Sequence, residues 1–259
     1  MTETVLVDIR GEVAVVTLNR PDTANTLDLA MGRDLLAAAL RCEADPAVRA
    51  VVLTGAGKAF CFGGDLRGMM SGEAPIEPYL KELTTHLHAA VARFMRMDAP
   101  VVAAVNGTTA GAGVGLVAMA DLAVMAAGAK ISLAYTGVGL TPDGGTSFLL
   151  PRIVGAKRAM ELILTNRALT APEALEWGLV NQVVPDAEVL DKALELASRL
   201  AAGPKGAFGR AKRLVAASLG ALESQLSLES ETIAAQAATA EGREGIGAFF
   251  EKRKAQYPR

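Results

Sequence analysis

The chain is poor in the residue types that build metal centres and disulfide scaffolds. Among its 259 residues are two cysteines, Cys42 and Cys61, and two histidines, His86 and His88. Two cysteines without a paired spacing argue against a disulfide framework and against a zinc site, and they fit a reduced compartment. We therefore expect neither a metal ion nor a disulfide.

An excess of charge of one sign is also missing. The formal net charge is −2, and the longest basic run is 252–254. A nucleic-acid-binding protein needs a basic stripe, so we expect no nucleic-acid partner. The opening residues include an acid, Glu3, and no apolar signal core follows them. The weakly polar stretch 101–129 is interrupted by glycines. We expect no secretory signal, no membrane span and a cytoplasmic protein.

Apolar residues are abundant, at 51% against 21% charged residues, so a large core is expected. Alternating or continuous apolar runs predict strands over residues 5–9, 13–19, 50–54, 101–106, 122–126 and 131–134. Helical periodicity predicts helices over 28–43 and 77–97, a helix ending at 119, and further helices over 156–164, 171–177, 187–202, 205–218 and 222–257, the last with a break near 242–247. Residues 55–72 read as a glycine-rich loop.

The order of these elements indicates an α/β fold. Strands and helices alternate in the first half, which is typical of crossover connections, and helices dominate after Gly155. We expect one α/β core over residues 1–195 and a helical region over 196–259.

Two glycine-rich turns, 59–66 and 106–113, each follow a predicted strand and precede a helix or loop. Such a turn directs free N–H groups outward at the positive end of a helix, and two converging turns form an oxyanion hole. Tight packing is the alternative explanation for the glycines of either turn. A dinucleotide fingerprint, Gly113-x-Gly115-x-x-Ala118, is disfavoured because it lies inside the predicted helix and no acidic residue follows near Leu133.

Several segments resemble the crotonase (enoyl-CoA hydratase/isomerase) superfamily: 18–21, 54–66, 105–113 and 177–180. The resemblance covers nearly the whole chain. It implies a spiral of ββα units, a helical C-terminal region for trimerisation and coenzyme A contact, a homotrimer or a hexamer built from two trimers, and an acyl-CoA thioester substrate. Coenzyme A would be part of the substrate, and no separate cofactor is implied. By position, the oxyanion donors would be the backbone N–H groups of Gly64 and Ala112.

The family's hydratases use two glutamates, which by position would fall at Gly115 and at or beside Thr136. Neither place holds a carboxylate. The remaining candidate is Asp143, in a Pro-Asp-Gly-Gly segment that is also ordinary turn chemistry. In subfamilies similar to this chain, an aspartate at this position is the working carboxylate.

Two subfamilies resemble the chain most in pattern. Segments 142–145, 149–152, 225–229 and 243–245 resemble ring-epoxide phenylacetyl-CoA isomerases, which also shift double bonds in enoyl-CoAs. Segment 160–167 resembles 4-chlorobenzoyl-CoA dehalogenase, in which the aspartate is a nucleophile. The dehalogenase histidine would correspond to His88, but Tyr135 stands in place of its tryptophan.

The resemblance also implies substrate contacts. Phe249 would pack on the adenine, and Lys252 would meet a phosphate of coenzyme A bound in the neighbouring subunit. Arg67 would meet the 3′-phosphate, and the remaining expected substrate contacts are Ala24, Phe62, His88 and Tyr135. Asp65 is expected to cap a helix.

These observations predict an acyl-CoA isomerase that uses an oxyanion hole and one catalytic aspartate. The alternatives are an enoyl-CoA hydratase, a 4-chlorobenzoyl-CoA-type dehalogenase and a non-catalytic acyl-CoA-binding protein.

Overall fold

The structure is a computed structural model, and it describes residues 3–71, 75–215 and 219–256. Its strands are β1 (Val5–Arg10), β2 (Val13–Leu18), β3 (Ala50–Gly55), β4 (Ala59–Cys61), β5 (Val101–Val105), β6 (Thr108–Ala110), β7 (Leu122–Ala126), β8 (Lys130–Ser132), β9 (Leu169–Thr170) and β10 (Gln182–Val184). Its α-helices are α1 (Leu29–Ala44), α2 (Leu66–Ser71), α3 (Ile76–Arg96), α4 (Ala112–Ala118), α5 (Thr146–Val154), α6 (Ala156–Thr165), α7 (Ala171–Glu176), α8 (Val189–Ala201), α9 (Lys205–Val215), α10 (Leu219–Ala237) and α11 (Ala240–Phe250). Short 3-10 helices are η1 (Pro21–Thr23), η2 (Thr136–Val138) and η3 (Asp186–Glu188).

The larger sheet has the strand order β1-β2-β3-β5-β7-β10. Its first two strands form an antiparallel hairpin, in which Gly11 takes the positive φ of 63° that the tight turn needs. The other neighbours are parallel. Strands β3 and β5 are buried throughout, as the continuous apolar runs of parallel strands require.

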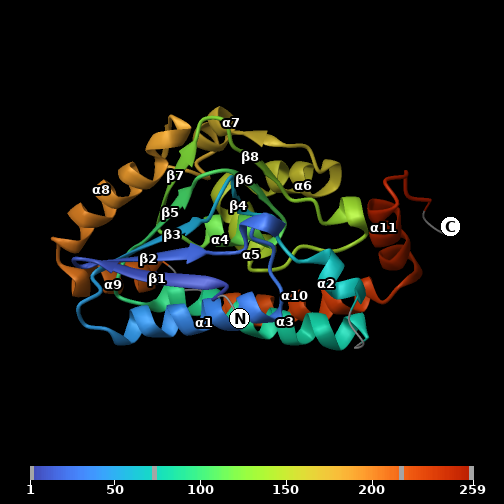
Figure 1. The fold of residues 1–259 in the computed structure, drawn as a ribbon, viewed down its shortest axis with the longest axis horizontal. Coiled ribbons are helices and arrows are strands. Elements are labelled where there is room, and N and C mark those ends of the chain that lie inside the picture. The colour runs from blue at the N-terminus through green and yellow to red at the C-terminus, as the bar shows by residue number, and fades with distance from the viewer. Residues whose placement is uncertain (1–2, 72–74, 216–218, 257–259) are drawn as a thin grey trace.

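A smaller sheet has the order β4-β6-β8-β9, with β4, β6 and β8 parallel. Successive strands alternate between the sheets: β3, β5 and β7 join the larger one, and β4, β6 and β8 the smaller one. The chain therefore winds as a spiral of strand pairs joined by helices, which confirms the predicted α/β crossover fold (Figure 1).

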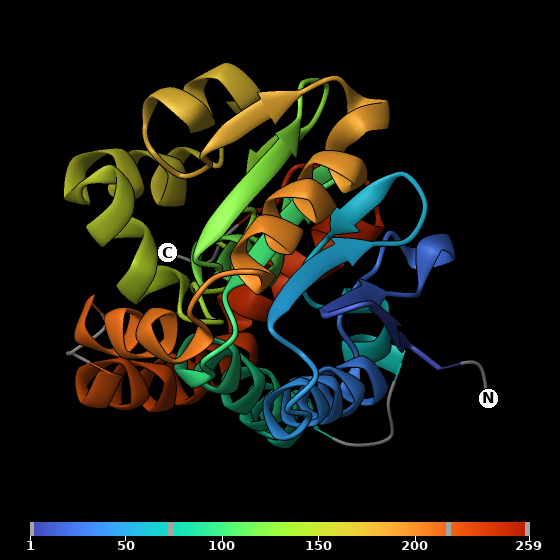
Figure 2. The ribbon, with the colours of Figure 1, turned by 90° about the vertical axis from the view of Figure 1, so that its left-hand side faces the viewer.

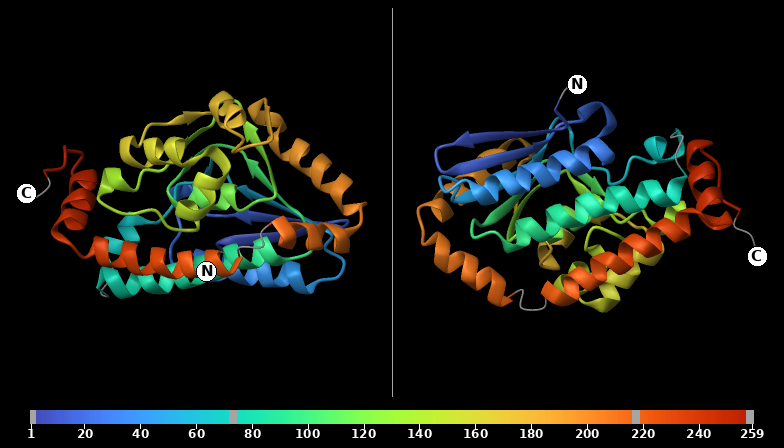
Figure 3. Two further views of the ribbon diagram at one scale, coloured as in Figure 1. Left: turned by 180° about the vertical axis from the view of Figure 1, so that it is seen from behind. Right: turned by 90° about the horizontal axis from the view of Figure 1, so that it is seen from below.

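Helices cover the sheets on separate sides. Helix α8 packs across β3, β5 and β7 (Figure 2). On the other side, α1, α3 and α10 lie next to one another, with α3 between the other two (Figure 3). Side chains from strands and helices, such as Leu53, Phe60 and Phe94, fill the core between these layers without exposure to solvent. The C-terminal helix α11 follows α10 and packs against it at one end of the molecule (Figure 1).

Most predicted elements are confirmed, with small shifts at their ends. The predicted loop 55–72 is wrong in part, because it contains β4 and α2, and the turn 106–113 contains β6. Strands of three residues are too short to show periodicity. Helix α5 was not predicted. The break in the last helical stretch lies at Ala238 and Thr239, where the Thr239 hydroxyl accepts a hydrogen bond from Gly242 N at 3.0 Å, and not at 242–247.

The predicted boundary between residues 195 and 196 falls inside α8, a single helix packed on the large sheet. A separation of core and helical region is therefore better placed after Ala201. The predicted helix ends at 218 and 257 lie outside the described residues, as do residues 72–74 of the predicted loop. No helix in the described ranges is both long and apolar enough to cross a membrane.

Replacing Gly107 by alanine should destabilise the fold. A Cβ at Gly107 would lie 2.0 Å from the backbone oxygen of Lys58, so the connection between β5 and β6 would have to move. We expect a loss of about 1–3 kcal/mol in the free energy of unfolding, measured by urea denaturation. Gly247→Ala is the matched control, because nothing lies within 4 Å of its Cβ position in α11. It should stabilise by up to about 1 kcal/mol. Equal stabilities of the two variants would contradict the steric argument.

Candidate active site

The two glycine turns lie in contact at the end of the smaller sheet. Parallel pairing of β4 with β6 brings their carboxyl ends together. A Cβ at Gly63, whose φ is 76°, would lie 3.0 Å from both Ala112 N and Ala110 O. Gly111 also has a positive φ, of 53°. Glycine at these two places therefore lets the two backbones come into contact. Both explanations of the glycine-rich turns, tight packing and an oxyanion hole, require this contact.

The N–H groups of Gly64 and Ala112 donate to no acceptor among the described residues. Both residues line the same cavity, of about 260 Å³. Ala112 is the first residue of α4, where backbone N–H groups have no partner inside the helix. The two predicted oxyanion donors are thus brought to one cavity.

The first turn is held in place by the segment that follows β2. Leu27 N donates to Gly63 O at 2.7 Å, and Asp65 N donates to Leu27 O at 2.9 Å, which directs the N–H of Gly64 away from this bridge. The Asp65 carboxylate accepts hydrogen bonds from Gly68 N at 3.1 Å and from Arg20 at 2.9 Å. Burial opposes ionisation of Asp65, but these hydrogen bonds outweigh it and lower its pKa. Asp65 therefore caps α2, as predicted.

Asp143 lies on the same cavity, with 6% of its surface exposed. Its Oδ1 accepts a hydrogen bond of 2.6 Å from the hydroxyl of Tyr135. Burial raises the pKa of Asp143 to about 6, although the Tyr135 hydrogen bond works in the opposite direction. The same burial, with the neighbouring carboxylate, raises the pKa of Tyr135 well above its ordinary value, so the phenol stays a donor. The pair gives a carboxylate that takes and releases protons near neutral pH.

Two further side chains, Glu229 and His88, hold the loop that follows Asp143. The sequence did not predict this role for either of them. Glu229, on α10, is 3% exposed and accepts hydrogen bonds from Gly145 N at 2.7 Å and from Ser147 N at 3.1 Å. The Nε2 atom of His88, on α3, accepts one from Gly144 N at 3.1 Å. No local pattern marks a glutamate in an amphipathic helix as the partner of a loop 84 residues earlier in the chain.

The cavity is otherwise apolar. Besides the oxyanion turns, Tyr135 and Asp143, it is lined by Leu27, Phe62, Leu66, Met69, Leu80, Leu83, Leu87, Ala110, Leu133, Ala134, Val138, Leu140, Ile233 and Phe249. The predicted contacts Phe62, Tyr135 and Phe249 are thus brought together there. Phe249 belongs to its own chain's cavity and is 58% exposed. A contact between it and coenzyme A in a neighbouring subunit stays a prediction.

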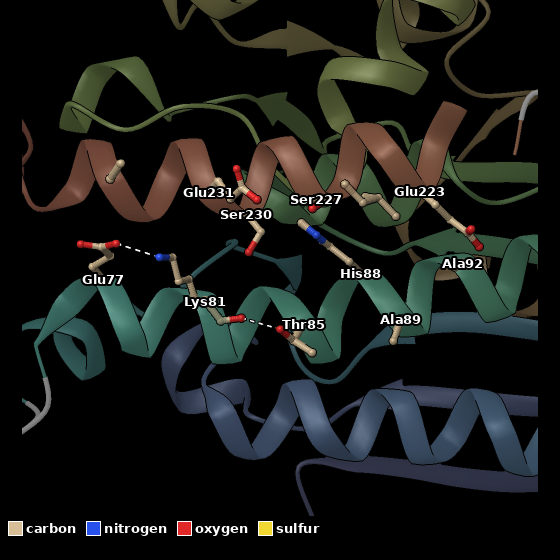
Figure 4. Close-up of a pocket in the computed structure, with 12 residues that line it drawn as sticks. Glu77, Lys81, Thr85, His88, Ala89, Ala92, Glu223, Ser227, Ser230 and Glu231 are labelled. Atoms are coloured by element: carbon tan, nitrogen blue, oxygen red, sulfur yellow. Dashed lines mark hydrogen bonds and ion pairs between the residues drawn. The ribbon is translucent and has the colours of Figure 1, made fainter. Parts of the chain in front are cut away.

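Four predicted contacts do not line the cavity. Ala24 is half-buried, and its carbonyl accepts a hydrogen bond from Phe62 N at 3.1 Å. Arg67, on α2, and Lys252, just after α11, are exposed outside the cavity. Their contacts with coenzyme A stay predictions. The prediction for His88 needs correction: its ring extends from α3 toward α10 and borders a separate groove (Figure 4). Its Nε2 already holds Gly144 N, so the geometry gives it no substrate contact.

The described residues contain no group of three or more histidine, cysteine, aspartate or glutamate side chains placed to hold a metal ion. Cys61, next to the first turn, is buried, and this burial raises the pKa of its thiol to about 12. The polar groups identified on the described cavity lining are therefore two backbone N–H groups, a phenol and one carboxyl.

Known proteins resemble this chain over nearly its whole length. The sequence model of a family described as enoyl-CoA hydratase/isomerase matches residues 8–259. The chain belongs to this family. It is 36% identical over 259 residues to the 1,2-epoxyphenylacetyl-CoA isomerase of Escherichia coli strain K12, with 99% of both chains covered. It is 39% identical over 251 residues to a probable enoyl-CoA hydratase of Rhodobacter capsulatus, with 96% of both covered.

A solved structure of an enoyl-CoA hydratase from Mycobacterium avium subsp. paratuberculosis K-10 superimposes with a TM-score of 0.89 at 32% identity, covering 99% of both chains. The predicted crotonase-type fold with its helical C-terminal region is confirmed. The relatives carry isomerase and hydratase names at similar identities, so the chain is an acyl-CoA enzyme of the enoyl-CoA hydratase/isomerase family.

Tyr135→Phe should raise the pKa of Asp143 further. The lost hydroxyl is the side-chain donor that favours the ionised carboxylate. A hydrogen bond to a charged group contributes roughly 1.5–3 kcal/mol, so we expect a shift of about one to two pH units. The shift is measured by ¹³C NMR of the carboxyl, assigned with Asp143→Asn. Tyr79→Phe, on α3, is the control and should leave this titration unchanged. An unchanged or lower midpoint in Tyr135→Phe would show that the phenol does not stabilise the carboxylate.

Proposed function

We propose that the protein is an acyl-CoA isomerase that moves a proton on the acyl chain, in a double-bond shift or in ring-epoxide isomerisation. The thioester oxygen binds between the N–H groups of Gly64 and Ala112. Asp143 removes a proton from the acyl chain and returns it at another carbon. The observation that carries this proposal is that the cavity's described lining holds one buried carboxyl together with two N–H groups that have no acceptor among the described residues.

The two amides supply the electrostatic part of the reaction. Removal of a proton from the acyl chain leaves an enolate, whose negative charge gathers on the thioester oxygen. Donors fixed by the backbone stabilise this charge without reorganisation, and each contributes about 3–4 kcal/mol in well-studied enzymes. Neither N–H group has an acceptor among the described residues, so both are available to a substrate oxygen.

Among the described cavity-lining residues there is no second carboxylate, which favours isomerisation over water addition. A Cβ at Gly115 would lie 2.4 Å from Gly144 O and 3.1 Å from Thr146 Oγ1. A glutamate at 115 is therefore incompatible with the loop that carries Asp143. The Thr136 hydroxyl, at the second glutamate place, donates to Ile163 O at 2.5 Å. Asp143 carries the only carboxyl among the described cavity-lining residues.

Two other candidates are less well supported. Dehalogenation would need His88 near the substrate, but this ring holds Gly144 N and is absent from the cavity lining. Burial also lowers the pKa of His88 to about 4, only partly offset by the backbone of Leu226. A non-catalytic binder has no use for a carboxyl buried in an apolar cavity, because burying it opposes its ionisation.

We also propose association into a homotrimer or a hexamer. Two large apolar side chains near the end of α9, Leu214 and Val215, are 76% and 90% exposed in the single chain. Apolar groups of this kind are covered in stable assemblies. Arg67 and Lys252 remain proposed contacts for coenzyme A phosphates, by cation–phosphate pairing.

Asp143→Asn should remove turnover while keeping affinity for the thioester. The amide cannot accept the substrate proton, so isomerisation should fall by about 10³-fold or more. We would measure product formation from 3-enoyl-, crotonyl- and aryl-acetyl-CoA by mass spectrometry, deuterium uptake into the acyl chain in heavy water, and thioester binding by calorimetry. Asp186→Asn, which alters a side chain bonded to Gly128 N, is the control and should behave as wild type.

The wild-type rate should fall as the pH drops through about 6, since the base must be ionised and burial raises its pKa to that value. Turnover or deuterium uptake by Asp143→Asn at the wild-type rate would refute the role of Asp143. Hydration of crotonyl-CoA without any isomerisation would favour the hydratase alternative.

A further inference from the structure

The loop that carries Asp143 has its backbone N–H groups held by side chains from two distant helices. Gly144 N donates to His88 Nε2 on α3, and Gly145 N and Ser147 N donate to Glu229 on α10. These residues directly follow Asp143 and lead into α5. Backbone N–H groups at a helix start have no partner inside the helix, so they depend on such acceptors. The orientation of Asp143 therefore depends on α3 and α10.

Glu229 makes the larger contribution to this arrangement. Its Oε2 accepts from Gly145 N at 2.7 Å, and its Oε1 accepts from Ser147 N at 3.1 Å and from the Ser147 hydroxyl at 2.5 Å. Gln225, one turn earlier on α10, donates to the same hydroxyl at 2.6 Å. Every described hydrogen-bond partner of the Glu229 carboxylate belongs to the segment that begins two residues after Asp143.

The two supporting helices are themselves joined at this level. His88 extends from α3 toward α10 beside Ser227 and Ser230 (Figure 4). His88 Nε2 and Glu229 Oε2 are 4.0 Å apart, and the hydroxyls of Thr84 and Ser230 are 2.5 Å apart. The acceptors are thus held as a unit, and a carboxylate is a stronger acceptor for these donors than a neutral group.

A purely structural role is the alternative explanation. However, burying a carboxylate opposes its ionisation, and a fold needs no ionisable group to cap a helix of nine residues. Burial raises the pKa of Glu229 to about 7, despite the hydrogen bonds from Ser147 and Gly145, and the Asp143 charge adds to this rise. The unfavourable burial of Glu229 therefore occurs beside the loop that orients the Asp143 carboxyl.

We propose that Glu229, assisted by His88, is a positioning residue that holds the Asp143 loop in its reactive geometry. Glu229 does not line the substrate cavity, so it acts through the loop and not on the substrate. The inference rests on the proposed proton transfer by Asp143.

The positioning role has a consequence for the pH dependence. The titratable groups around Asp143 and Glu229 are His88 from α3, Tyr135 ahead of η2 and Cys61 from β4. The pKa is about 4 for His88, well above 10 for Tyr135 and about 12 for Cys61. None of these three groups therefore titrates near pH 7. As the pH rises, Asp143 ionises near 6 and Glu229 near 7. The ionised Glu229 accepts all three donors at full strength. Both ionisations contribute, so the rate should rise over a broader pH range than ionisation of Asp143 alone would give.

Glu229→Gln tests this role. The amide nitrogen would face a backbone N–H, so one donor loses its acceptor. We expect kcat to fall by tenfold or more with KM within about twofold, and the pH dependence to narrow to that of a single group, Asp143, near 6. Hydrogen exchange of the 143–148 backbone, followed by mass spectrometry without substrate, should become faster. Glu231→Gln is the matched control: it lies on the same helix, is exposed and faces the groove between α3 and α10, and should behave as wild type.

Ser147→Ala is the second variant and tests the same role if Glu229→Gln does not fold. It removes one of the three donors and leaves the buried carboxylate of Glu229 in place. We expect a smaller loss of kcat and faster exchange of the same segment. Wild-type kcat, pH profile and hydrogen exchange in either folded variant would overturn the inference, as would a change confined to KM. Failure of the proposed function is distinct, because the wild-type enzyme itself would then show no isomerisation and no deuterium uptake.

Discussion

The contact between two glycine turns is the constraint on which the site depends. Parallel pairing of β4 with β6 makes the two strands end side by side, and the absence of a side chain at Gly63 lets the second turn come within contact distance. If either backbone were displaced by the width of a methyl group, the N–H groups of Gly64 and Ala112, which we propose bind one oxygen, would move apart. The spiral of strand pairs supplies the scaffold, since each pair sends one strand to each sheet.

Burial of ionisable groups is the second principle of the site. Asp143, Glu229 and His88 are each withdrawn from water, which raises the pKa of the two acids and lowers that of the histidine. The three are joined through consecutive backbone positions of one loop. A neutral His88 is suited to accept an N–H, and an ionised Glu229 is suited to accept several. The same desolvation that raises the pKa of Asp143 thus also governs the groups that hold its loop.

The apolar lining of the cavity strengthens the few polar interactions that we propose for catalysis. With few polar side chains around it, the thioester oxygen would meet its two amide donors with little competing water, and electrostatic interactions are stronger in such surroundings. Phe62 and Phe249 lie at the exposed border of this lining. Phe62 follows β4 and Phe249 lies in α11, so the glycine turn and the C-terminal helix both form the border of the cavity.

Local pattern in the chain was enough for the α/β alternation, for nearly all long helices and for the two glycine turns, because periodicity and turn chemistry act over short distances. The family resemblance added the expected pairing of Gly64 with Ala112 and the expected role of Asp143. Strands of three residues, helix α5 and the position of the helical break escaped prediction, since they depend on a neighbouring strand or on a cap. The role of Glu229 escaped as well, and His88 was misassigned to the substrate. Their significance arises from hydrogen bonds to a loop 84 and 56 residues away, and such contacts exist only after α3 and α10 have packed against the core.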